Sequence, residues 1–146
     1  MSGWYFHHLL LIVIAAVTAF AWLKGGWPER IGSILNLVVA VLFFVLQRLF
    51  AITALNTSLL VIDGLLGVGF LILALRYTSL WIGAAMLLQA AQFSLHAFYY
   101  VTVKPFDLLF MVVNNLVSWG ILVSILAGVG AHWLNVRRAT AKAAAP

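Results

Sequence analysis

Five long apolar runs occupy almost the whole chain, and short polar or charged breaks separate them. Each run has room to cross the hydrocarbon of a bilayer, which takes roughly 20 apolar residues as a helix. The runs are continuous and rich in leucine and alanine, whereas the strands of a membrane β-barrel alternate over about ten residues. The pattern therefore predicts an all-α, polytopic transmembrane bundle with five spans, residues 4–23, 31–52, 58–75, 79–101 and 108–134.

Turn-forming residues lie in the breaks between the runs. Gly25-Gly26 ends the first span, and Pro28 falls at or near the first turn of the second. The break at residues 76–78 is so short that the third and fourth spans must form a tight antiparallel hairpin. Residues 53–57 and 102–107 are expected as the other loops. Spans that are neighbours in sequence should therefore be neighbours in space.

Composition supports a membrane protein and excludes several kinds of chemistry. Of the 146 residues, 66% are hydrophobic and 8% are charged, far from the roughly 45–50% and 25% of soluble domains. The chain has no cysteine, which excludes disulfides, thiolate metal sites, c-type haem attachment and thiol nucleophiles. Residues 1–134 are predicted to form a single transmembrane domain. Residues 135–146 form a short, basic, alanine-rich tail, expected to be disordered or to lie on the membrane surface.

Charge predicts the orientation of the bundle. The net charge is +5, but the cations are scattered at the ends of the spans rather than gathered on one face, so we expect no nucleic-acid partner. With five spans, one side of the membrane holds Lys24, Arg30, Arg76, Arg137, Arg138 and Lys142, whereas the other holds Arg48 and Lys104. Because cytoplasmic loops carry the excess of lysine and arginine, we predict a cytoplasmic C-terminus and an exterior N-terminus.

The first apolar run is expected to be a retained span. Ala19-Phe20-Ala21 fits the small-x-small pattern of a signal-peptide cleavage site, but no lysine or arginine precedes the run. Its first side-chain cation, Lys24, follows the apolar residues instead. We therefore count this run among the five spans.

Charged residues within the spans are costly and require a partner, water or a route to the interface. Asp63 lies near the start of the third span, and Arg48 lies near the end of the second, about equally far from the expected loop between them. An antiparallel pair of helices would bring them to one depth. Three interpretations stay open: a structural ion pair, a proton or ligand site, or an Arg48 that reaches the headgroups while Asp63 faces water or is protonated.

A stripe of polar residues marks the fourth span. Gln89, Gln92 and His96 are spaced i, i+3, i+7, which places them on one face of a helix. Together with other polar residues expected in the exterior leaflet, they predict a pocket that opens outward or a set of hydrogen bonds between helices. The full candidate cluster is Asp63, Arg48, His96, Gln92, Gln89, Asn114, His7 and His8.

No cofactor is predicted with preference. His7 or His8 together with His96 would supply the two imidazoles of a b-type haem, and a quinone site is a related alternative. His132 lies at the opposite interface and is expected to be an interfacial histidine. We find no nucleophile with a positioned base, no phosphate-binding loop and no metalloprotease motif in the sequence, which favours a non-enzymatic protein.

Several short motifs resemble a family of small bacterial inner-membrane proteins that has no established activity. They are Pro28-Glu29-Arg30, Val61-Ile62-Asp63, Leu73-Ala74-Leu75-Arg76, Trp81, Gln89 and His96, within residues 22–134. The chain departs from that family at Ser79-Leu80-Trp81, where relatives often carry a Trp-Pro pair. The resemblance implies a multi-pass inner-membrane location.

These observations predict a small integral membrane protein without enzymatic activity. It would be an accessory subunit of a larger membrane complex or a bundle that binds a small ligand. A different function is proton-coupled or small-solute transport through the Asp63, Arg48 and His96 group. Haem or quinone binding is a third. In each case the lipid bilayer is the constant partner.

Overall fold

The protein is a bundle of five long helices. The computed structural model describes residues 3–49 and 52–144, and the side chains of residues 8–49 and 57–144. The helices are α1 (Gly3–Lys24), α2 (Trp27–Leu49), α3 (Ile52–Arg76), α4 (Leu80–Thr102) and α5 (Leu108–Ala143). No strand occurs within these described residues. The all-α prediction is confirmed.

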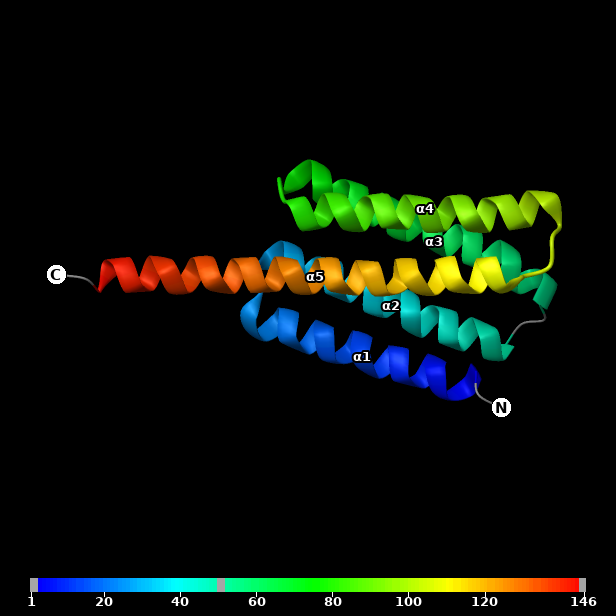
Figure 1. Ribbon diagram of the computed structural model, residues 1–146, viewed down its shortest axis with the longest axis horizontal. Helices are drawn as coiled ribbons and strands as arrows, with labels where there is room; N and C mark the ends of the chain where they lie inside the picture. The colour runs from blue at the N-terminus through cyan, green and yellow to red at the C-terminus, as the bar shows by residue number, and fades with distance from the viewer. Residues whose placement is uncertain (1–2, 50–51, 145–146) are drawn as a thin grey trace.

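The helices lie side by side and alternate in direction (Figure 1). Each helix packs against the next one in sequence, and α5 also packs against α1 and α2. The start of α1 and the end of α5 lie at opposite ends of the bundle, and the last turns of α5 project beyond the other helices (Figure 1). The prediction that sequence neighbours are spatial neighbours is confirmed.

Three helices are long and apolar enough to cross a membrane: α2, residues Thr57–Arg76 of α3, and α5. The described part of α1, His8–Lys24, is apolar but shorter. Many side chains on the outside of the bundle are apolar, such as Leu65 and Leu87, which are each 67% exposed. Such a surface is stable in lipid and unfavourable in water. The chain is therefore a helical membrane protein.

One helix start is as expected and one differs. Helix α2 begins at Trp27, just after the turn of Gly25 and Gly26, so Pro28 lies in its first turn as predicted. Helix α3 begins at Ile52, so the loop expected at residues 53–57 is helical; that stretch contains no glycine or proline to interrupt it.

The tail differs as well. It was expected to be disordered or to lie on the membrane surface, but it continues α5 as a helix to Ala143. Alanine, arginine and lysine are strong helix formers, and no glycine or proline occurs between residues 131 and 145. The helix therefore continues past the end of the predicted span.

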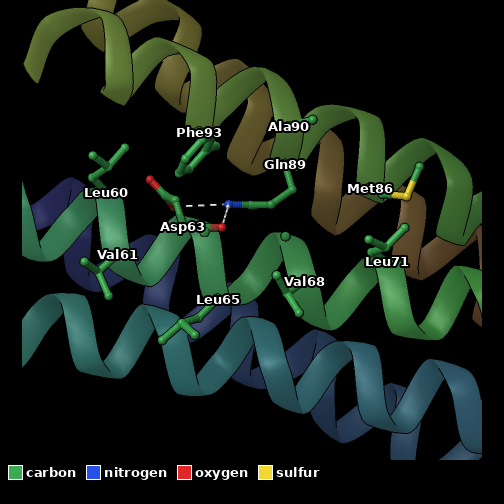
Figure 2. A pocket seen from close by; sticks show the side chains of 12 residues that line it. Leu60, Val61, Asp63, Leu65, Val68, Leu71, Met86, Gln89, Ala90 and Phe93 are labelled. Atoms are coloured by element: carbon green, nitrogen blue, oxygen red, sulfur yellow. Dashed lines mark hydrogen bonds between the residues drawn. The ribbon is translucent and has the colours of Figure 1, made fainter. Parts of the chain in front are cut away.

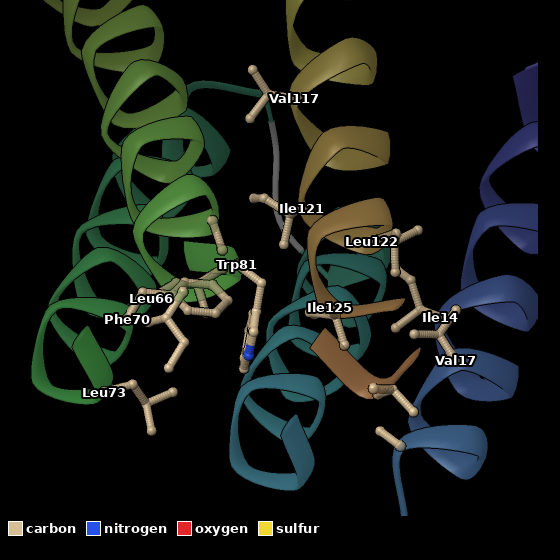
Figure 3. Packing of buried hydrophobic residues seen from close by; sticks show 14 residues of the cluster. Ile14, Val17, Leu66, Phe70, Leu73, Trp81, Val117, Ile121, Leu122 and Ile125 are labelled. Carbon is tan, nitrogen blue, oxygen red and sulfur yellow. The ribbon is translucent and has the colours of Figure 1, made fainter. Parts of the chain in front are cut away.

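The core is centred on Trp81, the second residue of α4 (Figure 3). Its indole lies between two glycines from other helices. A Cβ at Gly128 of α5 would be 2.5 Å from Trp81 Cδ1, and one at Gly32 of α2 would be 2.9 Å from Cη2. Phe70, Ile82 and Ile125 pack around this contact and are fully buried. Only glycine leaves enough room for the ring at these positions.

The indole also satisfies a buried carboxylate. Trp81 Nε1 donates to Glu29 Oε1 at 2.9 Å, and the backbone N–H of Gly26 donates to Glu29 Oε2 at 2.9 Å. Glu29 is only 5% exposed. A buried carboxylate needs such donors to offset its desolvation, so this contact joins the start of α2 to the start of α4.

Candidate functional site

Three polar side chains are buried together between α3 and α4. Asp63 of α3 is 5% exposed, and Gln89 and His96 of α4 are 1% and 7% exposed. Gln89 and His96 lie two turns apart on the same face of α4, as their spacing predicted. Asp63 is the twelfth residue of α3, near the middle of the helix. The cluster therefore lies near the middle of α3 rather than near its start, where the sequence placed Asp63.

Both oxygens of the Asp63 carboxylate have a partner on α4. Gln89 Nε2 donates to Asp63 Oδ1 at 3.1 Å and to the backbone carbonyl of Asp63 at 3.2 Å (Figure 2). His96 Nδ1 contacts Asp63 Oδ2, and this contact is an ion pair when the imidazole is protonated. An amide and an imidazole thus hold the carboxylate from one helix. The arrangement fixes the rotation of α3 relative to α4.

Gln89 and His96 each have one further polar atom in the cluster. Within the part of the chain that the structure describes, no hydrogen bond ends on Gln89 Oε1 or on His96 Nε2. The His96 ring lies 5.0 Å from the Phe110 ring of α5, centroid to centroid. Because Nδ1 is engaged by the carboxylate, Nε2 accepts a hydrogen bond in the neutral imidazole and donates one in the imidazolium.

A groove of about 670 Å³ runs along the outside of the bundle between α3 and α4. Asp63 and Gln89 are its polar lining residues, and the others are apolar or glycine (Figure 2). Val61, Leu65 and Val68 line it and are 53–67% exposed, so the groove opens sideways. In a membrane this opening would face the lipid tails rather than water. Sequence reasoning missed the groove, because its apolar lining has the same pattern as any lipid-facing surface.

Gln92 belongs to a separate contact. Its Nε2 donates to Asn114 Oδ1 of α5 at 3.0 Å. The polar stripe of α4 therefore divides between two neighbours: Gln89 and His96 bond to α3, and Gln92 bonds to α5. This second contact is a neutral hydrogen bond between helices, of the kind that commonly joins membrane helices.

Of the three interpretations left open for Arg48 and Asp63, the structure does not show the ion pair between them, because Asp63 pairs with His96. Arg48 is exposed near the end of α2, with its guanidinium 5.1 Å from the centroid of the Phe44 ring. Helix α3 begins at Ile52, so Asp63 lies about 16 Å along the helix from its start, at 1.5 Å per residue. The two residues are therefore at different depths.

The described histidine near the start of α1, His8, contacts α2. The His8 ring meets Phe44 of α2 edge-on, with centroids 5.3 Å apart. The side chain of His7 lies outside the described residues. Among the described residues, the backbones of α1 and α4 do not approach each other closely, so the haem alternative gains no support from the positions of His8 and His96. No group of three or more potential metal ligands occurs among the described side chains.

A second group of interacting polar side chains, centred on Asp107, lies at the connection between α4 and α5. The Tyr99 hydroxyl donates to Asp107, whose carboxylate caps α5 by accepting from the Phe110 N–H at 3.0 Å. Lys104 forms an ion pair with it at 2.9 Å. The pKa of Asp107 is held well below its usual range, first by the hydrogen bond from Tyr99 and then by those from Phe110 and Lys104. The bond to Asp107 in turn raises the pKa of Lys104.

Comparisons of the chain with protein-family models, with curated proteins and with solved structures find no match. The class that the fold defines is a helical membrane protein with a buried Asp–His–Gln cluster beside a lateral groove. The resemblance to small bacterial inner-membrane proteins stays a prediction.

Proposed function

We propose that the chain crosses a bacterial inner membrane five times, with its N-terminus outside and its C-terminus in the cytoplasm. Helices α1 and α4 run alongside the three helices that are apolar and long enough to span (Figure 1). Gln89, Gln92 and His96 lower the hydropathy of α4, but two of them are bonded to α3 and one to α5. Their polar groups are therefore directed toward neighbouring helices rather than toward lipid.

The absence of cysteine from the sequence makes this topology directly testable. Single cysteines would replace Val103 in the α4–α5 connection, Thr78 in the α3–α4 turn and Ala141 near the end of α5. A membrane-impermeant maleimide should label position 103 in spheroplasts, and positions 78 and 141 only after lysis. Equal labelling of positions 103 and 78 in spheroplasts would contradict the five-span arrangement.

Within that bundle, we infer a binding site for a small apolar molecule that carries one hydrogen-bonding group. Its apolar part would occupy the groove between α3 and α4, and its polar group would meet Gln89 at the wall. The groove volume of about 670 Å³ falls in the range of roughly 300–1,000 Å³ that is usual for small-molecule sites. The ligand would enter from the lipid.

One observation carries this proposal: a charged and amide cluster, almost fully buried, forms the wall of an otherwise apolar groove. Ionisable groups at membrane depth are rare and usually functional. A purely structural contact between α3 and α4 would not require a cavity beside it. The Gln89 amide presents an unused acceptor in that position, because only its Nε2 is engaged by Asp63.

Filling the groove tests the proposal. A Cβ at Gly67 would make only ordinary contact with Gln89 Cγ, at 3.7 Å, so Gly67→Leu would place a side chain in the groove beside the polar wall. Gly83→Leu is the matched control, since a Cβ there meets nothing within 4 Å and Gly83 does not line the groove. Both variants gain about the same helix propensity.

Each protein would be purified in mild detergent, and its organic extract compared by mass spectrometry. We expect one class of compound to be enriched in the wild type and in Gly83→Leu, and to be lost from Gly67→Leu. Identical extracts from all three proteins would refute the ligand site.

A second candidate is proton-coupled transport, which the buried Asp63–His96 ion pair favours because such pairs also serve proton relays. Reconstituted wild-type protein should then carry a pH-dependent flux that Asp63→Asn abolishes while the variant stays folded. No flux from the wild type would end this alternative.

The accessory-subunit alternative predicts a different result. Purification in mild detergent should then recover a larger membrane partner in stoichiometric amount. The exposed apolar sides of the bundle, such as Leu9 and Ile12 of α1, would supply the contact surface. Repeated isolation of the chain alone would exclude it.

A further inference from the structure

The three acidic side chains all have partners, and among the described residues only Asp107 forms an ion pair with a lysine or an arginine. The sequence has three acidic residues against eight lysines and arginines. Glu29 accepts from Trp81 and Gly26, Asp63 pairs with His96, and Asp107 pairs with Lys104. Among the described residues, no cation at the end of the bundle where α1 ends forms an ion pair with a carboxylate. An anion from outside the chain would complement these charges.

Two of these cations meet on one aromatic ring. Lys24 is the last residue of α1, and its Nζ lies 5.9 Å from the centroid of the Trp133 ring of α5. Arg137, one turn further along α5, has its Cζ 4.6 Å from the same ring. The same indole is thus in contact with cations from two different helices. Each charge is attracted to the ring face, and no carboxylate among the described residues forms an ion pair with either of them.

The other aromatic contacts at this end of the bundle have a single cation each. Arg30 lies over Trp22, and Arg76 lies over Tyr77. A lone cation over an interfacial ring is explained by the ordinary placement of both residue types at membrane surfaces. Two cations that converge from α1 and α5 are better explained by a shared ligand of opposite charge.

The surroundings indicate that this ligand is a lipid. Leu23 and Leu134 are the sequence neighbours of Lys24 and Trp133, and they are 77% and 48% exposed. Exposed apolar side chains therefore lie directly beside the charges. A phospholipid has the same arrangement, with a phosphate at the level of interfacial tryptophan and acyl chains below it.

We propose that Lys24, Trp133 and Arg137 form a binding site for the phosphate of an anionic phospholipid headgroup. The two cations hold the phosphate between α1 and α5, and the indole positions both of them. The acyl chains lie along the apolar outer surface of α1 and α5. The site rests on the proposed membrane location and is independent of the groove between α3 and α4, so either one can fail without the other.

The test compares charge-matched variants of the full-length protein in detergent. Lys24→Gln/Arg137→Gln removes the two cations of the site. Arg138→Gln/Lys142→Gln removes two cations from the same end of α5 that have no contact with Trp133. Trp133→Leu removes the ring and leaves the charge unchanged. Native mass spectrometry would measure the binding of dioleoylphosphatidylglycerol and of dioleoylphosphatidylcholine, and circular dichroism would verify that each variant is folded.

We expect the wild type to bind phosphatidylglycerol in preference to phosphatidylcholine. The Lys24/Arg137 variant should lose roughly 10- to 30-fold in affinity for phosphatidylglycerol, because two contacts between a cation and an anionic lipid are removed. Trp133→Leu should also weaken binding, whereas the Arg138/Lys142 variant should change it by less than about threefold.

Three results would overturn the site. Equal losses in the two double variants would show a diffuse electrostatic attraction, and unchanged binding by Trp133→Leu would remove the positioning role of the ring. Displacement of phosphatidylglycerol by millimolar inorganic phosphate would identify free phosphate, rather than a lipid, as the ligand.

Discussion

Removing one member of the Asp63–His96 pair should destabilise the protein far more than removing an ordinary hydrogen bond between its helices. In His96→Leu, the buried Asp63 carboxylate keeps only the amide of Gln89 as a donor. Breaking a buried ion pair in this way costs about 3–5 kcal/mol, because one charge is left without compensation. A hydrogen bond between membrane helices averages only about 0.6 kcal/mol.

The chain contains its own reference for that comparison. Gln92 lies on the same helix as His96, one turn away. Gln92→Leu breaks the neutral hydrogen bond from α4 to Asn114 of α5. We expect it to lose about 0.6 kcal/mol, with an upper limit near 2 kcal/mol. The difference between His96→Leu and Gln92→Leu therefore isolates the contribution of buried charge.

A double-mutant cycle completes the measurement. Asp63→Leu leaves His96 Nδ1 without its partner at a cost of about 1–3 kcal/mol, while Gln89 keeps its bond to the backbone carbonyl of residue 63. Asp63→Leu/His96→Leu removes the carboxylate and its imidazole partner together. The double variant should be more stable than the sum of the two single losses predicts, by about 2 kcal/mol or more.

Unfolding in mixed detergent micelles, titrated with sodium dodecyl sulfate and followed by circular dichroism, would give the four free energies. The reasoning is refuted if His96→Leu costs no more than Gln92→Leu, or if the two single losses add up to that of the double variant.

Two further predictions concern the ends of the helices. Asp107 has a lowered pKa, so its contacts with Tyr99 and its other donors stabilise the fold above the ordinary carboxyl value of 3.8, and this stabilisation is lost as the pH falls below that value. The difference in free energy of unfolding between wild type and Asp107→Asn should therefore be constant from pH 5 to 7 and shrink below about pH 4. A difference that grows on acidification would contradict the lowered pKa of Asp107. Gly128→Ala places a methyl group against Trp81 and should lower the free energy of unfolding by about 1–3 kcal/mol. In the control Gly130→Ala, the added Cβ meets nothing within 4 Å, so that variant should be neutral or slightly stabilised. Equal effects of the two substitutions would argue against the close approach of Trp81.

The position of the core tryptophan illustrates what a local pattern leaves open. Trp81 lies at the start of α4, next to the break at residues 76–78. Its indole nevertheless points into the bundle and donates to Glu29, which is 52 positions away in the sequence. Nothing in the sequence around either residue encodes that pairing, because it depends on how α2 and α4 pack.

The sequence by itself determined the helical class, the approximate helix positions and the polar face of α4. These properties follow from local chemistry: apolar runs that suit lipid, a break at residues 76–78, and a spacing that aligns Gln89 with His96.

Only the tertiary structure decided which polar groups meet. Three features depend on the rotation and axial position of each helix in the bundle. They are the pairing of Asp63 with His96 rather than Arg48, the division of the polar stripe between α3 and α5, and the groove beside Gln89. Those are fixed by contacts between distant segments, such as Trp81 against Gly128, and periodicity within a single helix carries no information about them.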